Sequence, residues 1–299
     1  MIKRIIDISE QAYIHIKHQQ MLIERDGETI GQVPTEDLGV LILQHPAIVI
    51  SQAAIIACQK NGAVIVFCDE YHLPYSVLLP LSDGHTLHTK IIREQIAISE
   101  PTKKRIWQQI IQQKINQQRE TLKILNKNPK PLERLVKQVK TGDSENHEAQ
   151  AAQKYWRLLM GDAFRRDRDA EGINTLLNYG YAVIRAMIAR AIVGSGLHPS
   201  IGLHHRNQYN GLCLADDLME PFRPWVDRIV YRIAQQQTTL TIDKPTKAIL
   251  LQLLSQNVSL GERAMPLMVA SHYLVANLKQ AFGDRKVKLD YPRWIESQS

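Results

Sequence analysis

The chain has few cysteines and no long apolar run, and both shortages restrict what it can be. Its 299 residues include only three cysteines, at positions 58, 68 and 213, without the paired spacing of a zinc finger. An odd number of scattered cysteines predicts reduced thiols rather than a disulfide framework. No uninterrupted apolar run approaches the roughly 20 residues of a membrane span, and the charged start MIKRIIDIS is not a signal peptide. These absences favour a cytoplasmic protein with no membrane partner.

Positive charge is in excess and is concentrated in one segment. The chain has 37 Lys and Arg against 30 Asp and Glu, with a pI near 9.2. Residues 103–140 hold eleven basic side chains and only two acidic ones. Such a surface suits a phosphate backbone, although a solvated helix face is the plainer alternative. The candidate DNA contacts are two groups, one opening this segment and one in the charged loop 161–172: Lys103, Lys104, Arg105, Arg165 and Arg166.

Two kinds of hydrophobic periodicity divide the chain. Up to about residue 81 the apolar residues alternate or run in short blocks between polar turns, which is typical of strands, with one helix at 51–62. Beyond residues 83–84 the spacing is helical, with helices expected at 102–126, 132–139, 146–160, 171–193, 214–235, 244–256 and 260–280. The prediction is an α+β protein with a small β-rich domain (1–83) followed by a larger all-α domain (84–299).

The most informative stretch is 198–224, HPSIGLHHRNQYNGLCLADDLMEPFRP. It places His204 and His205 on a loop and Asp216, Asp217 and Glu220 near the start of a helix. Asp217 and Glu220 are three residues apart and share one helix face. Acidic residues are also common in first helical turns for electrostatic reasons, and loop histidines are usually solvated. A second feature is needed to favour a functional interpretation.

That feature is Glu148, in the segment NHEAQAAQKYWRLLMG at 146–161. Ser144 or Asn146 can cap this helix, and alanines at 149, 151 and 152 leave room near the carboxylate for another chain or a ligand. Carboxylates with one imidazole suit a divalent ion, and this donor set favours Mg²⁺ or Mn²⁺ over zinc. The sequence therefore indicates a mixed oxygen and nitrogen metal site.

Several motifs in order resemble the CRISPR adaptation integrase family, the CRISPR-associated protein numbered one, in its compact type II form. EAQAAQKYW resembles the family's glutamate helix, and NTLLNYGYAVIRA at 174–186 resembles its core helix. PSIGLHH and LADDLMEPFRP resemble the histidine loop and the carboxylate helix, and HPAIVISQAAIIACQKNGAVIVFCDEYHLP at 45–74 resembles the end of the small β domain. The resemblance spans nearly the whole chain.

The resemblance implies a set of roles. Glu148, His205 and Glu220 are implied to be the catalytic residues and the metal ligands, since the spacing from Pro199 selects His205 over His204. Asp217 and Arg223 are expected to orient these ligands or to bind phosphate. The implied reaction joins the 3′-hydroxyl ends of foreign DNA fragments to the CRISPR repeat by transesterification.

The resemblance also implies partners. They are DNA, a second copy that pairs through the β domain, and a small ferredoxin-like protein, the family member numbered two, in a heterohexamer. Other type II adaptation proteins are further possible partners. Two alternatives remain open at this point. One is a stand-alone metal-dependent nuclease that cuts branched DNA in repair, and the other is a non-catalytic DNA-binding scaffold.

Overall fold

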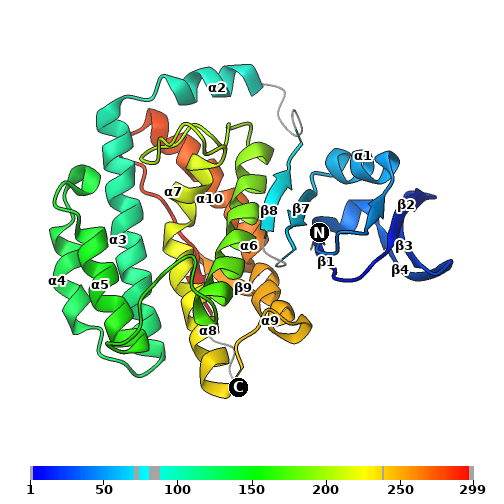
Figure 1. Ribbon diagram of the computed structural model, residues 1–299. Coiled ribbons are helices and arrows are strands. Elements are labelled where there is room, and N and C mark those ends of the chain that lie inside the picture. The colour runs from blue at the N-terminus through cyan, green and yellow to red at the C-terminus, as the bar shows by residue number, and fades with distance from the viewer. Residues whose placement is uncertain (1–2, 71–73, 81–87, 238, 296–299) are drawn as a thin grey trace.

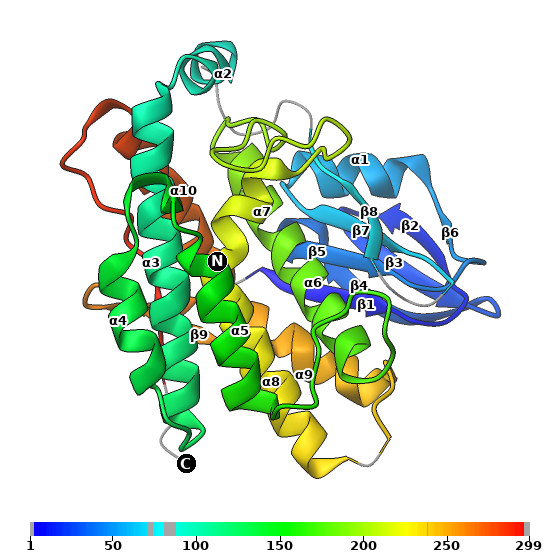
Figure 2. The ribbon, with the colours of Figure 1, turned by 60° about the vertical axis from the view of Figure 1, so that its left-hand side comes forward.

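The protein has a β-rich N-terminal part and a mostly helical remainder, as the sequence predicts (Figure 1). The computed structural model describes residues 3–70, 74–80, 88–237 and 239–295. The expected domain boundary at residues 83–84 lies outside these described residues and stays a prediction. Figure 2 shows the β part beside the helical part, with α6 (Ile173–Gly194) between the sheet and the outer helices.

Two four-stranded sheets form the N-terminal part. In the first, the order is β1-β5-β7-β8, with β1, β5 and β7 parallel and β8 antiparallel to β7. In the second, the order is β4-β3-β2-β6. The bounds are β1 Arg4–Ile8, β2 Tyr13–Lys17, β3 Gln20–Arg25, β4 Glu28–Pro34, β5 Leu38–Leu43, β6 Val49–Ile50, β7 Val64–Cys68 and β8 Pro74–Leu78, with α1 at Gln52–Lys60.

The first sheet is covered on both faces, which explains why LGVLIL is apolar throughout. All six residues of β5 are buried. Because side chains alternate along a strand, Leu41 and Leu43 enter the small N-terminal core, whereas Val40 and Ile42 belong to the large core of the helical part. The helical part is therefore seated directly on this sheet.

The helical part surrounds α6, whose side chains are mostly buried. Its other long elements are α2 His88–Ile96, α3 Glu100–Ile124, α4 Lys130–Gln138, α5 His147–Met160, α8 Arg223–Gln236, α9 Lys244–Ser255 and α10 Leu267–Gly283. By length and composition α6 could cross a membrane, but 78% of its most apolar window is buried inside the protein. That burial is typical of a core helix.

The helix expected at 214–235 is broken into three pieces. They are α7 (Cys213–Met219), a 3-10 turn at Glu220–Phe222, and α8. Pro221 and Pro224 have no backbone N–H, so neither can donate to the carbonyl four residues earlier, and an unbroken α-helix is disfavoured. The break lies at Glu220, one of the predicted catalytic residues.

The C-terminal region is not purely helical. The helix expected from residue 260 begins only at Leu267, because β9 (Asn257–Leu260) and β10 (Arg263–Pro266) form a hairpin, which β11 (Arg293–Trp294) joins. The turn of the hairpin contains Gly261 at φ +60°, a value glycine adopts readily. The tail is thereby docked against the helical part, and Tyr291 is buried.

Candidate active site

Glu148 is held in the first turn of α5 by two separate caps. The backbone of Asn146 is in the left-handed conformation, and its side chain accepts a hydrogen bond from the N–H of Ala149. The buried carboxylate of Asp143 accepts from the N–H groups of His147 at 2.9 Å and Glu148 at 3.0 Å. Of the two expected caps, Asn146 is the one used. These contacts satisfy free N–H groups of the first turn and fix the start of the helix beside α3.

Asp217 organises the histidine loop from within. Its side chain is fully buried, and its two oxygens accept from the N–H groups of Leu203, His204 and His205 at 2.6, 3.1 and 3.1 Å. Gly202 makes this wrapping possible. A Cβ there would lie 2.4 Å from the carbonyl oxygen of His205, a contact that no side chain tolerates. The loop therefore requires glycine at position 202 and a carboxylate at 217.

The two neighbouring histidines have different surroundings. The ring of His204 stacks on Trp107 of α3, with centroids 4.2 Å apart and planes 1° from parallel. The ring of His205 lies 2.7 Å from Asp217 through Nδ1 and lines a cavity. The hydrogen bond that Nδ1 of His205 donates to Asp217 raises the pKa of His205, although partial burial opposes it. With Nδ1 bonded to the carboxylate, Nε2 is the nitrogen left for a ligand.

Glu220 is buried between two cations. Its Oε2 lies 2.5 Å from Nζ of Lys114, and its Oε1 accepts from Nε of Arg223 at 2.7 Å. Burial alone would raise the pKa of Glu220, but the charges of Arg223 and Lys114 outweigh it and lower the pKa to about 2. Lys114 also lies 2.6 Å from Oε1 of Glu148, so one ammonium group joins both carboxylates.

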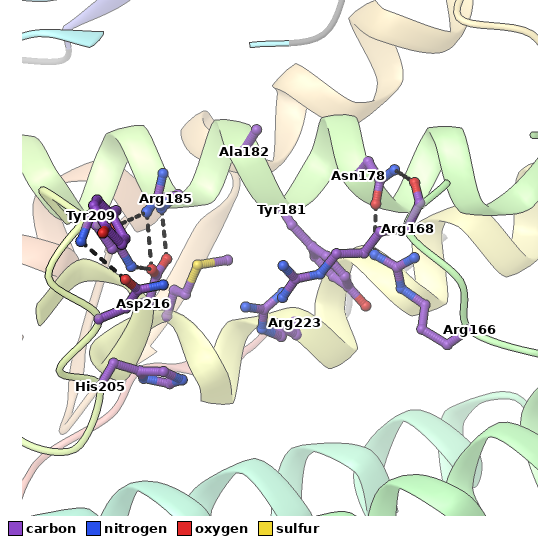
Figure 3. A pocket seen from close by; sticks show the side chains of 13 residues that line it. Arg166, Arg168, Asn178, Tyr181, Ala182, Arg185, His205, Tyr209, Asp216 and Arg223 are labelled. Carbon is purple, nitrogen blue, oxygen red and sulfur yellow. Dashed lines mark hydrogen bonds and ion pairs between the residues drawn. The ribbon is translucent and has the colours of Figure 1, made fainter. Parts of the chain in front are cut away.

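Glu148, His205 and Glu220 line one cavity of 340 Å³, although they come from three separate segments. Asp217 lies behind His205, and Arg223 lines the cavity beside Glu220. A second cavity of 610 Å³ shares His205 and Arg223 with the first. Figure 3 shows its lining, with arginines along its length and His205 at one side. The arginines that line one or both cavities are Arg166, Arg168, Arg185 and Arg223.

The donor set fits a hard divalent cation. Two carboxylates and one imidazole nitrogen face the same space, and the ammonium of Lys114 already occupies a cation position between the carboxylates. Within the described ranges, however, no group of three His, Cys, Asp or Glu side chains is arranged to hold a metal ion. The ligands predicted from sequence share a cavity without forming a coordination sphere.

The predicted DNA contacts have several environments. Arg166 lines both cavities and donates to Asn174 and Asn178. Arg165 and Lys104 are exposed, whereas Lys103 is ion-paired with Glu100 at 3.3 Å. Arg105 donates instead to three backbone carbonyls near the end of α10. Within this predicted set, only Arg166 faces the candidate site.

Lys114 and Asp227 were missed by the sequence analysis. Lys114 was counted in the basic segment, but it lies on the buried face of α3, one turn from Ile110 and Gln118. Its spacing from the apolar residues Ile106 and Ile110, four residues apart on the same face, was an available signal. Asp227 also lines the cavity; its burial raises its pKa to about 7, against the opposing hydrogen bond from Tyr181. Nothing in the sequence distinguishes Asp227 from a surface acid on α8.

Comparisons with known proteins agree on one family. The model of the family described as CRISPR associated protein Cas1 matches residues 6–253. A CRISPR-associated endonuclease Cas1 from Neisseria meningitidis serogroup C (strain 8013) is 35% identical over 280 residues, covering 92% of this chain and 90% of that protein. A second relative, from Francisella tularensis subsp. novicida (strain U112), is 27% identical and covers 77% of this chain and 79% of its own length.

Solved structures share the fold at lower identity. A Cas1 protein from Thermotoga maritima has a TM-score of 0.79 at 15% identity, covering 95% of this chain and 99% of that one. A casposase bound to an integration product has the same TM-score at 20% identity, covering 97% and 93%. The family model spans most of the sequence and the first relative covers nearly the whole of it. This chain belongs to the Cas1 family of CRISPR-associated proteins.

Proposed function

We propose that the chain is a divalent-metal-dependent DNA endonuclease and integrase of CRISPR adaptation. The observation that carries the proposal is the convergence of Glu148, His205 and Glu220 on one arginine-lined cavity. The curated relatives are named endonucleases, and a casposase with this fold is bound to an integration product. These names support phosphodiester chemistry as the reaction of this chain.

Glu148, Glu220 and Nε2 of His205 would hold Mg²⁺ or Mn²⁺. When bound, such an ion stabilises charge on a phosphodiester and lowers the pKa of an attacking hydroxyl. The protein's own contribution is positional. Asp217 fixes the tautomer and orientation of His205, and Arg223 fixes Glu220 through its Nε. In integration the attacking group is the 3′-hydroxyl of a foreign fragment, and water in its place gives cleavage.

The arginines of the two cavities provide a path for the DNA backbone. Arg168 lines both cavities, and Arg185 is anchored to Asp216 at 2.6 Å in the larger one. Exposed Tyr209 lies at the same wall and offers a face for base stacking. This combination of guanidinium groups and an aromatic ring suits the end of a DNA strand that enters the site.

A second basic surface lies on α4, within the segment that the sequence analysis singled out. Lys130, Arg134 and Lys137 are exposed at i, i+4 and i+7, so they form one stripe opposite buried Leu132 and Leu135. We expect replacing the three basic residues by Gln to weaken DNA binding regardless of sequence. If each contacts one phosphate, the slope of log K against log salt falls by up to about 2.7. An unchanged slope of log K against log salt would mean that this stripe is an ordinary solvated surface and does not contact DNA.

The proposed partners follow the same family. Solved neighbours include a complex that contains Cas1 and Cas2 and a Cas1–DNA complex, each at 16% identity. For the homodimer, the β4-β3-β2-β6 sheet offers three exposed apolar side chains: Tyr13, Ile30 and Val49. Val49→Glu is expected to shift a dimer toward monomer in light scattering after size-exclusion chromatography. A dimer that persists in this variant pairs through another surface.

The function is tested by strand transfer. Short duplexes with free or blocked 3′-hydroxyls are incubated with a supercoiled plasmid carrying the repeat, Mg²⁺ or Mn²⁺, and the small partner. Joined product that requires the free 3′-hydroxyl and the metal supports the integrase. Nicking of the plasmid without joining, or cutting of a branched DNA added in a parallel reaction, supports the repair nuclease instead. The absence of metal-dependent chemistry leaves a DNA-binding scaffold.

Site variants complete this test. Glu148→Gln and His205→Ala are expected to abolish joining while DNA binding is retained. Glu145→Gln is the matched control, because Glu145 is a half-exposed carboxylate just before α5 that pairs with Lys140. Full joining by either site variant would remove Glu148 or His205 from the proposed machinery.

A further inference from the structure

One ammonium group holds together the two carboxylates that the proposed function assigns to a metal. Nζ of Lys114 lies 2.6 Å from Oε1 of Glu148 and 2.5 Å from Oε2 of Glu220. Its side chain is 12% exposed and reaches the site from the middle of α3. No other described basic residue pairs with both glutamates.

The charges of this cluster already balance. Glu148 and Glu220 supply two negative charges, and Lys114 and Arg223 supply two positive ones through direct ion pairs. A divalent cation added to these four groups would bring two further positive charges against Lys114 and Arg223, which is unfavourable because the carboxylates between them are already paired and partly shielded from water. A protonated lysine also has no lone pair with which to bind a metal. The ammonium and the metal therefore compete for the same oxygens.

We propose that Lys114 is a built-in counter-cation that keeps Glu148 and Glu220 together in the metal-free protein and is displaced when the divalent ion binds. This inference rests on the proposed metal site and adds a residue that sets its affinity. Lys114 is a positioning residue. Without it, two carboxylates drawn from α5 and the α7–α8 break would repel each other and splay apart.

After displacement, the ammonium stays within the cavity that it lines. The other cations of that wall are Arg166, Arg168 and Arg223, and the carboxylate of Asp227 lies in the same lining. A phosphodiester entering the cavity is the anion that matches this set of positive groups. The same lysine thus stabilises the carboxylates before metal binding and faces the DNA backbone afterwards.

The test measures Mn²⁺ binding to the full-length, DNA-free protein by electron paramagnetic resonance of the free ion. Lys114→Met removes the competing charge with similar side-chain length. We expect Lys114→Met to bind Mn²⁺ at least about tenfold more tightly than wild type, because the metal no longer has to break two ion pairs. It should also show a larger increase in melting temperature when Mn²⁺ is added. Lys123→Met, at the exposed end of the same helix, is the matched control and should bind as wild type does.

A second variant guards against misfolding of the first. Lys114→Gln can still donate hydrogen bonds to the carboxylates without a charge, and it is expected to show the same tighter binding. Mn²⁺ affinity equal to or weaker than wild type in folded Lys114 variants would overturn the displacement while leaving the metal site intact. Glu220→Gln separates the two proposals, since it should lose the Mn²⁺ site. If wild type and the Lys114 variants bind no Mn²⁺, both the metal site and the displacement are wrong.

Discussion

Asp217→Asn is the substitution that most directly tests how this site is assembled. The change preserves size and replaces one carboxylate oxygen by an amide group. Each oxygen of Asp217 now accepts two hydrogen bonds. Oδ2 accepts from the N–H groups of Leu203 and His204, and Oδ1 accepts from the N–H and Nδ1 of His205. Whichever oxygen is replaced by the amide NH2, the two N–H groups that it accepted from then face another hydrogen-bond donor.

The magnitude follows from these contacts. A hydrogen bond to a charged group contributes about 1.5–3 kcal/mol, so losing two of them in a fully buried position predicts a loss of about 3–6 kcal/mol in the free energy of unfolding. Urea unfolding measures this loss. Asp216→Asn, the same change on the adjacent and less buried residue, is the control, because its partners are Arg185 and Asn210 rather than the histidine loop.

A second readout belongs to His205 itself. Asp217 raises the pKa of His205 in the folded protein, so its stabilising contribution is fully present at low pH and is lost as pH rises through that pKa. Asp217→Asn should lower the pKa of His205 in an NMR titration, and the stability difference from wild type should be greatest in acid. An unfolding free energy within about 1 kcal/mol of wild type, together with an unchanged His205 pKa, would refute the proposed role of Asp217.

Three further predictions concern packing and burial. Burial lowers the pKa of His272 to about 4, below its usual 6.5, so the unfolded chain binds the proton first and about 3 kcal/mol of stability is lost as pH falls across that window. His272→Gln, which keeps an acceptor for Arg190, should flatten the pH dependence of unfolding there, and identical curves for the two proteins would contradict this. A Cβ at Gly180 would lie 2.4 Å from Val226, so Gly180→Ala should cost about 1–3 kcal/mol by overpacking α6 against α8. In the double variant with Val226→Ala, the loss in the free energy of unfolding should be smaller than the sum of the losses in the two single variants. Simple additivity in urea unfolding would argue against the contact. Arg105→Gln should speed limited proteolysis of the segment after α10, because Arg105 donates to the carbonyls of Arg285 and Val287 there and to that of Ala281 in the last turn of α10. An unchanged cleavage rate would mean that those bonds do not hold the segment.

The tertiary contacts also explain where the helix predictions were inaccurate. Pro221 and Pro224 were visible in the sequence, but the apolar periodicity around them favoured one continuous helix. Because the two prolines lack N–H groups, the helix is interrupted and Glu220 lies at the break, where its carboxylate turns toward α3. The β9–β10 hairpin was missed because its strands are only four residues long, and a third strand from the chain's end completes the sheet.

The sequence by itself determined the order of elements and the residue types of the site. Alternation in the first third predicted strands and helical spacing predicted the long helices, whereas the resemblance to the family, through the spacing from Pro199, gave the proposed role to His205. Local patterns carry this information because a strand or a helix buries one face at a fixed period. Glu148 and Glu220 stood out as carboxylates near the expected starts of two helices, and the resemblance to the family gave them their proposed roles.

Only the tertiary structure decided what surrounds those residues. Lys114 is 34 positions from Glu148 and 106 from Glu220, and no local pattern records that its ammonium joins them. The stack of Trp107 on His204 gives His204 a different environment from His205. It likewise depends on α3 lying against the loop. Ion pairs and ring contacts between distant segments arise from packing in three dimensions. For this reason the carboxylates proposed as metal ligands could be named from the sequence, and the ammonium group that pairs with both of them could not.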